Sequence, residues 1–401
     1  MDKKIYYSTI LFFVVLIVLN VFTSYIPNST DLGDYLGAAK SFNNDFSAKM
    51  RSTHSWIFGF LLAPLMKLIP GVFVTRLLNF IWLPLIALLL FFITKSKKAF
   101  FTFLLSPVVW FVAPSITPIL PASFLFILTY YYFKKFESKN NYFYLIISGL
   151  SLGLASLLWD TVFLVFIIFS IVFFFDKKIK DLAIFSIFFG LIASIRFIFD
   201  WYFFNFPFFS LFKFLGGNFM YLLGLTPLGQ LVFSPYNFFI LLILPFPLFI
   251  YCLFKSTKNN FKEYSKEIIF SILYILMFLK NAQIRYMLFL TPFFIILLYK
   301  SFNKKIFLFN ILISILIIPF FIYPPSVYER DNLIQNDLVI ISSDYSNNTL
   351  LAISGNPKNL DFYYELAIIY QGDKINEFIS QKDYEMWKNN NTNYWNFNIV
   401  S

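Results

Sequence analysis

The stretch of residues 28–56, which reads NSTDLGDYLGAAKSFNNDFSAKMRSTHSW, lies between two hydrophobic segments and decides how the fold is interpreted. It carries two carboxylates three residues apart, Asp31 and Asp34, and the only histidine of the chain, His54. Almost every other long stretch is apolar. The topology depends on which side of a membrane this polar stretch occupies, and the function depends on whether it is a catalytic loop or a hydrophilic connector.

The composition is typical of a polytopic membrane protein. Hydrophobic residues make up 59% of the 401 residues, aromatic residues 23% and charged residues 13%, with a mean hydropathy of +0.71. A soluble domain normally carries about 25% charged residues. The formal net charge of +11 comes mostly from lysines in short clusters between apolar runs. Such a pattern sets membrane orientation and argues against nucleic acid as a partner. The single cysteine, Cys252, excludes a disulfide within the chain.

Hydropathy predicts a series of membrane-spanning helices, each of which needs about 20 apolar residues to cross a bilayer. The amino-terminal run has no small-residue cleavage site, so we expect a retained span rather than a signal peptide. The predicted spans are residues 5–25, 72–94, 99–116, 120–133, 142–158, 161–175, 182–199, 235–254, 268–279, 286–299 and 306–323.

Lysine clusters orient these spans. They lie at the amino terminus and around residues 95–98, 134–139, 177–180, 255–266 and 300–305. With the amino terminus inside, the clusters alternate correctly through about eleven spans, and the carboxyl terminus emerges outside. Residues 56–69 decide whether the number of membrane crossings before each later lysine cluster is odd or even. This segment is apolar but short and contains Pro64 and Lys67, so we expect a helix in the outer interface instead of a span.

The expected fold is therefore an all-α polytopic membrane protein with a small α/β cap. The transmembrane domain covers residues 1–325, with an external loop of interfacial helices at 27–71 and an external aromatic loop at 200–234. The extracytoplasmic domain covers residues 326–401. There, residues 337–343 predict a strand, residues 345–359 are polar and turn-rich, and residues 363–370 and 376–381 predict helices. A tail of this size is too small to bury a large core alone.

Asp31 and Asp34 are the candidate catalytic carboxylates. The residues that follow predict a short amphipathic helix. A carboxylate in the first turn of a helix is also a common capping group, so each Asp has a structural and a functional interpretation. The residues that recur at helical spacing are Tyr35, Ala38, Ala39 and Phe42.

This region resembles the first external loop of the GT-C superfamily of membrane glycosyltransferases, which includes protein mannosyltransferases and aminoarabinose transferases. Leu32 stands where many members carry a second acid. The residues that carry the resemblance are Asp31 four positions before Tyr35, Ala38-Ala39-Lys40, His54-Ser55-Trp56 leading into FGFLLAPLMKLIPG, Arg76 in the next span, and Arg285-Tyr286 followed by Pro292.

The resemblance implies an inverting transfer of a sugar from a polyprenyl-phosphate-linked donor to a protein, lipid or glycan acceptor on the extracytoplasmic face. Such a reaction needs a carboxylate that deprotonates the acceptor hydroxyl, and a cationic or metal site for the departing phosphate. Asp31 is the first choice as base and Asp34 the second. The other carboxylate is then expected to bind the acceptor or a Mg²⁺ or Mn²⁺ ion.

The few cations on the external side are candidates for binding the donor phosphate: Arg196, Lys280 and Arg285. A protein that obeys the positive-inside rule has no topological reason to place arginine outside, and arginine recognises phosphate through two parallel hydrogen bonds. Each has a structural alternative. Arg196 stands four residues before Asp200, a spacing that allows a local ion pair. Arg285 stands just before the predicted span 286–299, where it is placed to anchor that helix at the membrane interface.

The candidates for acceptor or sugar binding are Tyr35, His54, Asp160 and Trp201. Asp160 lies between two spans at the external face, where it either caps the following helix or joins the site. His54 has an equally simple role as a hydrogen-bonded surface histidine, and tryptophans such as Trp201 commonly lie at membrane interfaces.

The alternative function is a transporter or flippase for a lipid or a polar solute. Transporters usually place ionisable residues inside their spans and often contain paired repeats. Here the predicted spans are nearly free of charge and no internal repeat is found. A third possibility, a non-catalytic membrane scaffold, leaves the external carboxylates and cations unexplained. The expected partners are thus the sugar donor, the acceptor and membrane lipids.

Overall fold

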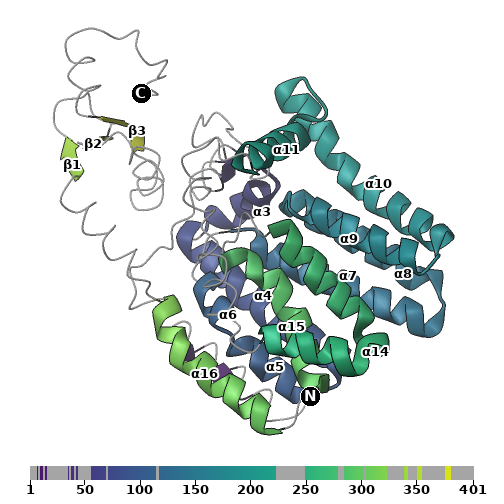
Figure 1. Ribbon diagram of the computed structural model, residues 1–401. Coiled ribbons are helices and arrows are strands. Elements are labelled where there is room, and N and C mark those ends of the chain that lie inside the picture. The colour runs from purple at the N-terminus through teal and green to yellow at the C-terminus, as the bar shows by residue number, and fades with distance from the viewer. Residues whose placement is uncertain are drawn as a thin grey trace. The chain divides into compact units, whose positions relative to one another are not determined.

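The protein is predominantly helical (Figure 1) in a computed structural model that describes residues 56–68, 71–113, 117–222, 249–278, 284–301, 304–322, 338–341, 350–354 and 375–380. It also describes Tyr7, Ile10, Leu11, Val14, Val15, Tyr35, Ala38, Ala39, Phe42 and Asn43. The chain divides into two compact units. The first comprises Met1–Tyr25, Leu78–Pro114 and Pro118–Ile322, and the second comprises Ile26–Leu77, Ser115–Thr117 and Tyr323–Ser401.

Most described helices coincide with segments predicted from hydropathy. The segment predicted as an external loop, residues 200–234, contains a further helix, α11 (Phe209–Leu222), and the segment predicted as interfacial is α3 (Trp56–Met66). The helices that coincide with predicted spans are α4 (Gly71–Thr94), α7 (Ile119–Lys139), α8 (Tyr142–Leu158), α9 (Val162–Phe175), α10 (Ile179–Phe204), α15 (Met287–Ser301) and α16 (Lys304–Ile322).

One predicted span, residues 99–116, is broken into two helices, α5 (Lys97–Leu104) and α6 (Pro107–Val112). Pro107 occupies the first turn of α6, where its missing N–H is no loss, but it cannot continue a preceding helix. A single helical span over 99–116 is therefore wrong. The apolar residues of this segment are nevertheless buried, as expected for part of a core.

A second difference concerns residues 255–266, which were predicted to connect two spans. They form the middle of one continuous helix, α14 (Phe249–Phe278). The sequence KSTKNNFKEYSK contains neither glycine nor proline, so nothing in it stops a helix. A short 3₁₀ helix, η1 (Ile284–Tyr286), then leads into α15.

The carboxyl-terminal region contains a three-stranded sheet with strand order β1-β2-β3. β1 (Leu338–Ile341) confirms the strand predicted at residues 337–343 and pairs antiparallel with β2 (Leu350–Ser354). β2 lies within the stretch predicted to be turn-rich. β3 (Ile375–Ser380) pairs parallel with β2, so the helix predicted at 376–381 is wrong, because strand pairing overrides the weak local propensity. The helix predicted at 363–370 lies outside the described residues.

In the first unit, α7, α8, α9 and α10 lie side by side (Figure 1). The crossing of α8 with α10 is unusually close, because α8 presents Gly149 and Gly153 toward it. A Cβ atom added at Gly153 would lie 2.7 Å from Ile192 Cβ and 2.9 Å from the Phe189 carbonyl oxygen. Small residues spaced four apart allow such approaches between membrane helices. The glycines therefore fix the position of α10 against α8.

Among the described residues, two helical segments are long and apolar enough to cross a membrane, Leu77–Thr94 and Ile179–Phe204. The outward face of α10 is as apolar as its buried face: Ile187, Leu191 and Ile198 are each about 60% exposed. Shorter apolar helices include Tyr142–Leu158, Val162–Phe175 and Met287–Tyr299.

In the second unit, the helical assignment of Tyr35, Ala38, Ala39 and Phe42 agrees with the predicted amphipathic helix. Tyr35, Ala38 and Ala39 are buried. The ring of Tyr35 packs edge-to-face on Phe58 of α3, with 5.4 Å between ring centroids. Gly59 permits this contact, because a Cβ atom there would lie 2.6 Å from Ala38 Cβ. Asn43 Nδ2 also donates a hydrogen bond to the Ala63 carbonyl oxygen at 2.8 Å.

A test of the close crossing compares two glycine substitutions. Gly153→Ala should lower the free energy of unfolding by about 1–3 kcal/mol, because backbone and side-chain atoms of α10 block the new methyl group. Gly190→Ala on α10 is the matched control, since no atom lies within 4 Å of its added Cβ. It should be neutral or slightly stabilising. Thermal unfolding in detergent measures both, and equal effects would contradict the close crossing.

Candidate functional site

A buried arginine lies at the centre of the candidate site. Arg196 of α10 is the largest fully buried side chain among the described residues, with 1% of its surface exposed. It belongs to the buried stripe of α10, where Phe189 and Ala193 precede it and Asp200 follows. The helical spacing of this stripe turns Arg196 toward α8 and α9. A charge in such a position is costly unless it is paired.

Asp160 provides the pairing charge. It lies in the turn between α8 and α9, and its carboxylate forms an ion pair with Arg196 Nη1. The same nitrogen donates a hydrogen bond to the Ser156 carbonyl oxygen at 3.1 Å, near the end of α8. The structure therefore brings together two of the residues selected from the sequence, Arg196 and Asp160. The predicted role of Asp160 in acceptor or sugar binding stays a prediction.

Asp200 has a different partner. Its Oδ2 atom accepts a hydrogen bond from the Ser210 N–H at 2.9 Å, and its Oδ1 atom accepts from the Ser210 hydroxyl. Ser210 is in the first turn of α11, so Asp200 caps this helix and ties it to α10. The chain reverses between them at Asn205, which has a left-handed conformation with φ 54°. The ion pair of Arg196 is thus with Asp160, not with Asp200 as the sequence spacing suggested. We call Asp160, Arg196, Asp200 and Ser210 the Arg196 cluster.

Two nitrogens of the Arg196 guanidinium have no partner in the part of the chain that the structure describes. Nε and Nη2 are buried and have no hydrogen-bond partner among the described residues. Leaving a buried donor unpaired costs about 1–3 kcal/mol, and more for a charged group. Nε and Nη2 belong to the planar fork that recognises phosphate or carboxylate groups. The geometry is therefore suited to an anionic ligand that supplies the missing acceptors.

The cluster contains two carboxylates and one guanidinium, so an anion there requires further positive charge. Two described elements near the cluster carry such a charge: α11, with Lys213 one turn after Ser210, and η1, with Arg285. In η1, the Tyr286 ring lies 5.1 Å from Trp159, the residue before Asp160. Tyr274 fixes this element by donating a hydrogen bond to the Tyr286 carbonyl oxygen at 2.7 Å. Arg285 precedes Tyr286 and lies over its ring at 5.4 Å. Arg285 is thus next in the chain to a ring that packs on Trp159, the residue before Asp160.

The other predicted site residues do not all join this cluster. Trp201 follows Asp200 on α10 but is 65% exposed, so it lies on the outer surface of the helix. Tyr35 is buried in the second unit against Phe58. Asp31, Asp34, His54 and Lys280 lie outside the described residues. No group of three or more His, Cys, Asp or Glu side chains suited to a metal occurs among the residues that the structure describes.

Several residues of the site were not selected from the sequence. The G-x-x-x-G spacing of Gly149 and Gly153 was a usable signal for the close crossing that brings Arg196 to the Ser156 carbonyl. Ser210 had no such signal, because its contact with Asp200 depends on the reversal at Asn205. The role of Ser156 is carried by its backbone, which sequence patterns do not reveal.

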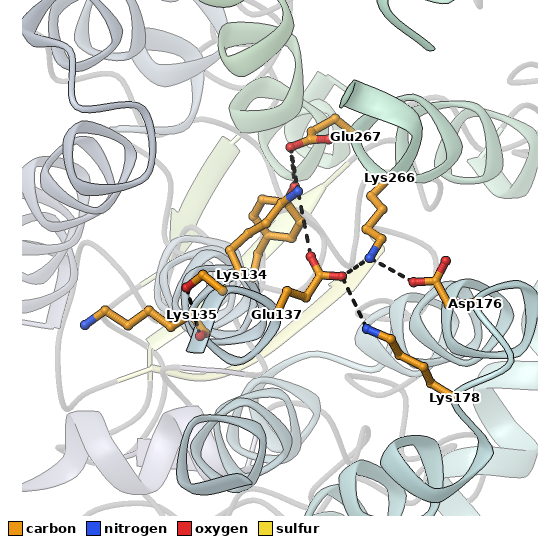
Figure 2. Close-up of polar contacts among 9 residues, drawn as sticks. Lys134, Lys135, Glu137, Asp176, Lys178, Lys266 and Glu267 are labelled. Carbon is orange, nitrogen blue, oxygen red and sulfur yellow. Dashed lines mark hydrogen bonds and ion pairs between the residues drawn. The ribbon is translucent and has the colours of Figure 1, made fainter. Parts of the chain in front are cut away.

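A second polar cluster lies where the other ends of α7 and α9 meet α14 (Figure 2). Lys134 Nζ lies 3.2 Å from Glu267 Oε1, which also accepts a hydrogen bond from the Tyr130 hydroxyl at 2.6 Å. Lys266 pairs with Glu137 and, at 2.8 Å, with Asp176. We call the residues of this cluster the charged network: Tyr130, Lys134, Glu137, Asp176, Lys178, Lys266 and Glu267.

The charged network joins elements that are far apart in the sequence. Burial, with a smaller contribution from the Lys134 charge, lowers the pKa of Lys266 from 10.5 to about 8, while the Glu267 carboxylate acts in the opposite direction. The lysines were expected in connections between spans, but their acidic partners were not selected from the sequence. Contacts over more than 130 residues, such as that of Tyr130 with Glu267, cannot be read from local patterns.

Comparison with known proteins adds no family assignment. No protein-family model matches the sequence, and no curated protein matches it.

The Arg196–Asp160 pair leads to a prediction about stability. Asp160→Asn and Arg196→Gln should each lower the free energy of unfolding by about 3–5 kcal/mol, because each removes the ion pair from a charge that stays buried. The double variant should cost clearly less than the sum of the two. Unfolding in detergent measures the cycle. Strictly additive effects would show that the two side chains do not interact.

Proposed function

We propose that the protein is a multi-pass membrane glycosyltransferase of the GT-C type, with about eleven spans, an internal amino terminus, and the loop 27–71 and the carboxyl-terminal α/β domain on the extracytoplasmic face. It moves a sugar from a polyprenyl-phosphate-linked donor to a protein, lipid or glycan acceptor, with inversion at the anomeric carbon.

The surface of the first unit supports the membrane part of this proposal. α16 is the clearest case, because its buried positions include Asn310 and Ser314 while Leu308, Leu312 and Leu316 are more than half exposed. A helix that exposes apolar side chains and buries polar ones fits lipid as its surroundings better than water.

The observation that carries the enzymatic part is the unsatisfied guanidinium of Arg196. Its Nε and Nη2 atoms are buried donors to which the described residues offer no acceptor, and a phosphate oxygen supplies one. The ion pair with Asp160 positions the guanidinium. Arg285 and Lys280 supply the additional positive charge that the two carboxylates of the cluster make necessary.

The proposed reaction is a single displacement. Asp31, or alternatively Asp34, takes the proton from the acceptor hydroxyl, whose oxygen then bonds to the anomeric carbon. The bond between this carbon and the phosphate oxygen breaks, its electron pair stays on the phosphate, and the polyprenyl phosphate leaves. Tyr35, His54 and Trp201 are the candidates for holding the sugar or the acceptor. A Mg²⁺ or Mn²⁺ ion at Asp31 and Asp34 stays a prediction on which no step depends.

A transporter or flippase remains the second candidate, and one observation favours it. The predicted spans contain more buried charge than the sequence suggested, with Arg196 and Asp200 inside α10 and Glu267 at the edge of a span. Ionisable groups buried within membrane spans mark the substrate or ion pathways of many transport proteins. A covalent glycosylated product distinguishes the enzyme, and ligand-coupled flux without a product distinguishes the transporter.

The identity of the base is tested with purified protein and labelled polyprenyl-phosphate sugars. Asp31→Ala should reduce turnover by a factor of about 10²–10⁴, the usual contribution of a general base, and Asp34→Ala should have the smaller effect. Asp181→Ala, in the first turn of α10 at the end away from the Arg196 cluster, is the control and should leave turnover unchanged. Unchanged turnover in both loop variants would contradict the assignment.

The phosphate role of Arg196 is tested by Arg196→Lys, which keeps the charge but loses the fork. Binding of polyprenyl phosphate alone should weaken about tenfold, the equivalent of one charge-assisted hydrogen bond. Asp200→Asn is the comparison variant, because it perturbs the cap of α11 but keeps the guanidinium and removes one negative charge from the cluster, so the affinity for polyprenyl phosphate should not fall. Equal affinity of Arg196→Lys and the parent protein, measured by titration in detergent, would remove Arg196 from the donor site.

A further inference from the structure

The charged network is electrically balanced within itself. Lys134, Lys178 and Lys266 face Glu137, Asp176 and Glu267, and each carboxylate is engaged by at least one of the three lysines. Figure 2 shows Lys134, Lys178 and Lys266 directed into the network, whereas Lys135 is directed away from it. The three acids of the network are therefore already occupied and do not neutralise the lysines around them. Asp181, in the first turn of α10, is a further acid at this end and offsets one of the surrounding positive charges.

Four lysines around the network form a surplus of positive charge. None of them has a carboxylate within ion-pair distance among the described residues. Lys135 is half-buried and the other three are exposed. We call these four residues the lysine rim: Lys135, Lys139, Lys177 and Lys180.

The lysine rim is one surface, although its members lie around two turns, α7–α8 and α9–α10. Lys135 and Lys139 lie at the end of α7, Lys177 in the α9–α10 turn and Lys180 at the start of α10. Lys178 joins the turns, because its Nζ atom lies 4.0 Å from Glu137 and 5.9 Å from the centroid of the Phe136 ring. Lys180 Nζ likewise lies 5.5 Å from the centroid of the Tyr142 ring. The two turns are thus held side by side.

Aromatic rings hold the lysines of the rim in place. Lys135 Nζ lies 4.5 Å from the Tyr131 ring and 5.4 Å from the Tyr144 ring, and Lys139 Nζ lies 5.7 Å from the same Tyr144 ring. Cation–π contacts of this kind orient an ammonium group without neutralising it. The lysine side chains therefore lose less conformational entropy when an anion binds.

Large apolar side chains surround these charges. Phe174 and Phe175 at the end of α9 are 66% and 69% exposed, Phe143 at the start of α8 is 60% exposed, and Ile179 at the start of α10 is 56% exposed. Exposed aromatic rings beside lysines fit the boundary between acyl chains and headgroups of a bilayer. Free phosphate in water has no apolar group that these rings can contact.

We infer that the lysine rim is a binding surface for the headgroups of anionic phospholipids. The rim lysines contact the headgroup phosphates, and the four apolar side chains enter the adjoining acyl region. This inference rests on the membrane part of the proposed function and is independent of the glycosyl transfer.

The test uses the full chain reconstituted in phosphatidylcholine with a trace of spin-labelled phosphatidylglycerol or phosphatidylcholine. Electron spin resonance of the motionally restricted lipid gives the association constant of one lipid relative to the other. Replacing all four rim lysines by glutamine should reduce the preference for phosphatidylglycerol about fivefold or more, since each lysine near an anionic surface contributes about 1 kcal/mol. The preference of the parent protein should also fall in high salt.

The matched control replaces Lys258, Lys300, Lys304 and Lys305 by glutamine, which removes the same charge from the same predicted side of the membrane. It should retain most of the preference. Equal losses in both variants would show a general effect of net charge, and no loss in the rim variant would show that the lipid binds elsewhere; either result overturns the inference. Absence of any restricted lipid would overturn the membrane placement as well.

Discussion

The buried guanidinium of Arg196 is the constraint on which the packing of α10 against α8, the α8–α9 turn and α11 depends. The charge has to be paired inside the bundle, because transfer of an unpaired ion from water to the interior costs several kcal/mol. Asp160 and the Ser156 carbonyl provide the pairing only because Gly149 and Gly153 let α10 approach α8 closely. The position of one side chain thus depends on two glycines of the neighbouring helix.

This arrangement also determines how the next helix is placed. One turn beyond Arg196, Asp200 caps α11 through Ser210, so the arginine and the cap share one buried stripe of α10. The two guanidinium nitrogens that have no partner among the described residues set this stripe apart from a purely structural ion pair. In a purely structural pair, the surrounding backbone normally satisfies such donors. The charged network is different, because its three lysines and three carboxylates largely satisfy one another.

The sequence predicted individual helices well where apolar runs are bounded by polar residues. α8 begins and ends at the predicted residues 142 and 158, and α4 differs from the prediction by one residue at its start. Hydropathy alone could not predict the break at Pro107 or the continuity of α14 through residues 255–266. A polar composition suggested a connection there, although helix propensity favoured a helix. The strand β3 depends on its pairing with β2, which is information that the local sequence does not contain.

The candidate site was predictable in part. The scarcity of external cations was sufficient to select Arg196, and the location of Asp160 between two spans was sufficient to select it as a candidate. Their contact was not predictable, since Arg196 had a nearer acid at Asp200 and 36 residues separate it from Asp160. Which of two carboxylates pairs with an arginine is decided by how the helices cross, and that crossing depends on glycines whose effect is steric.

The most direct test of the account is a density map of the full chain in lipid nanodiscs with polyprenyl phosphate bound. The account predicts a phosphate oxygen at about 3 Å from Nε or Nη2 of Arg196, with the ion pair to Asp160 intact. A phosphate bound elsewhere, with both nitrogens of Arg196 still unpaired or occupied by the protein itself, would contradict it.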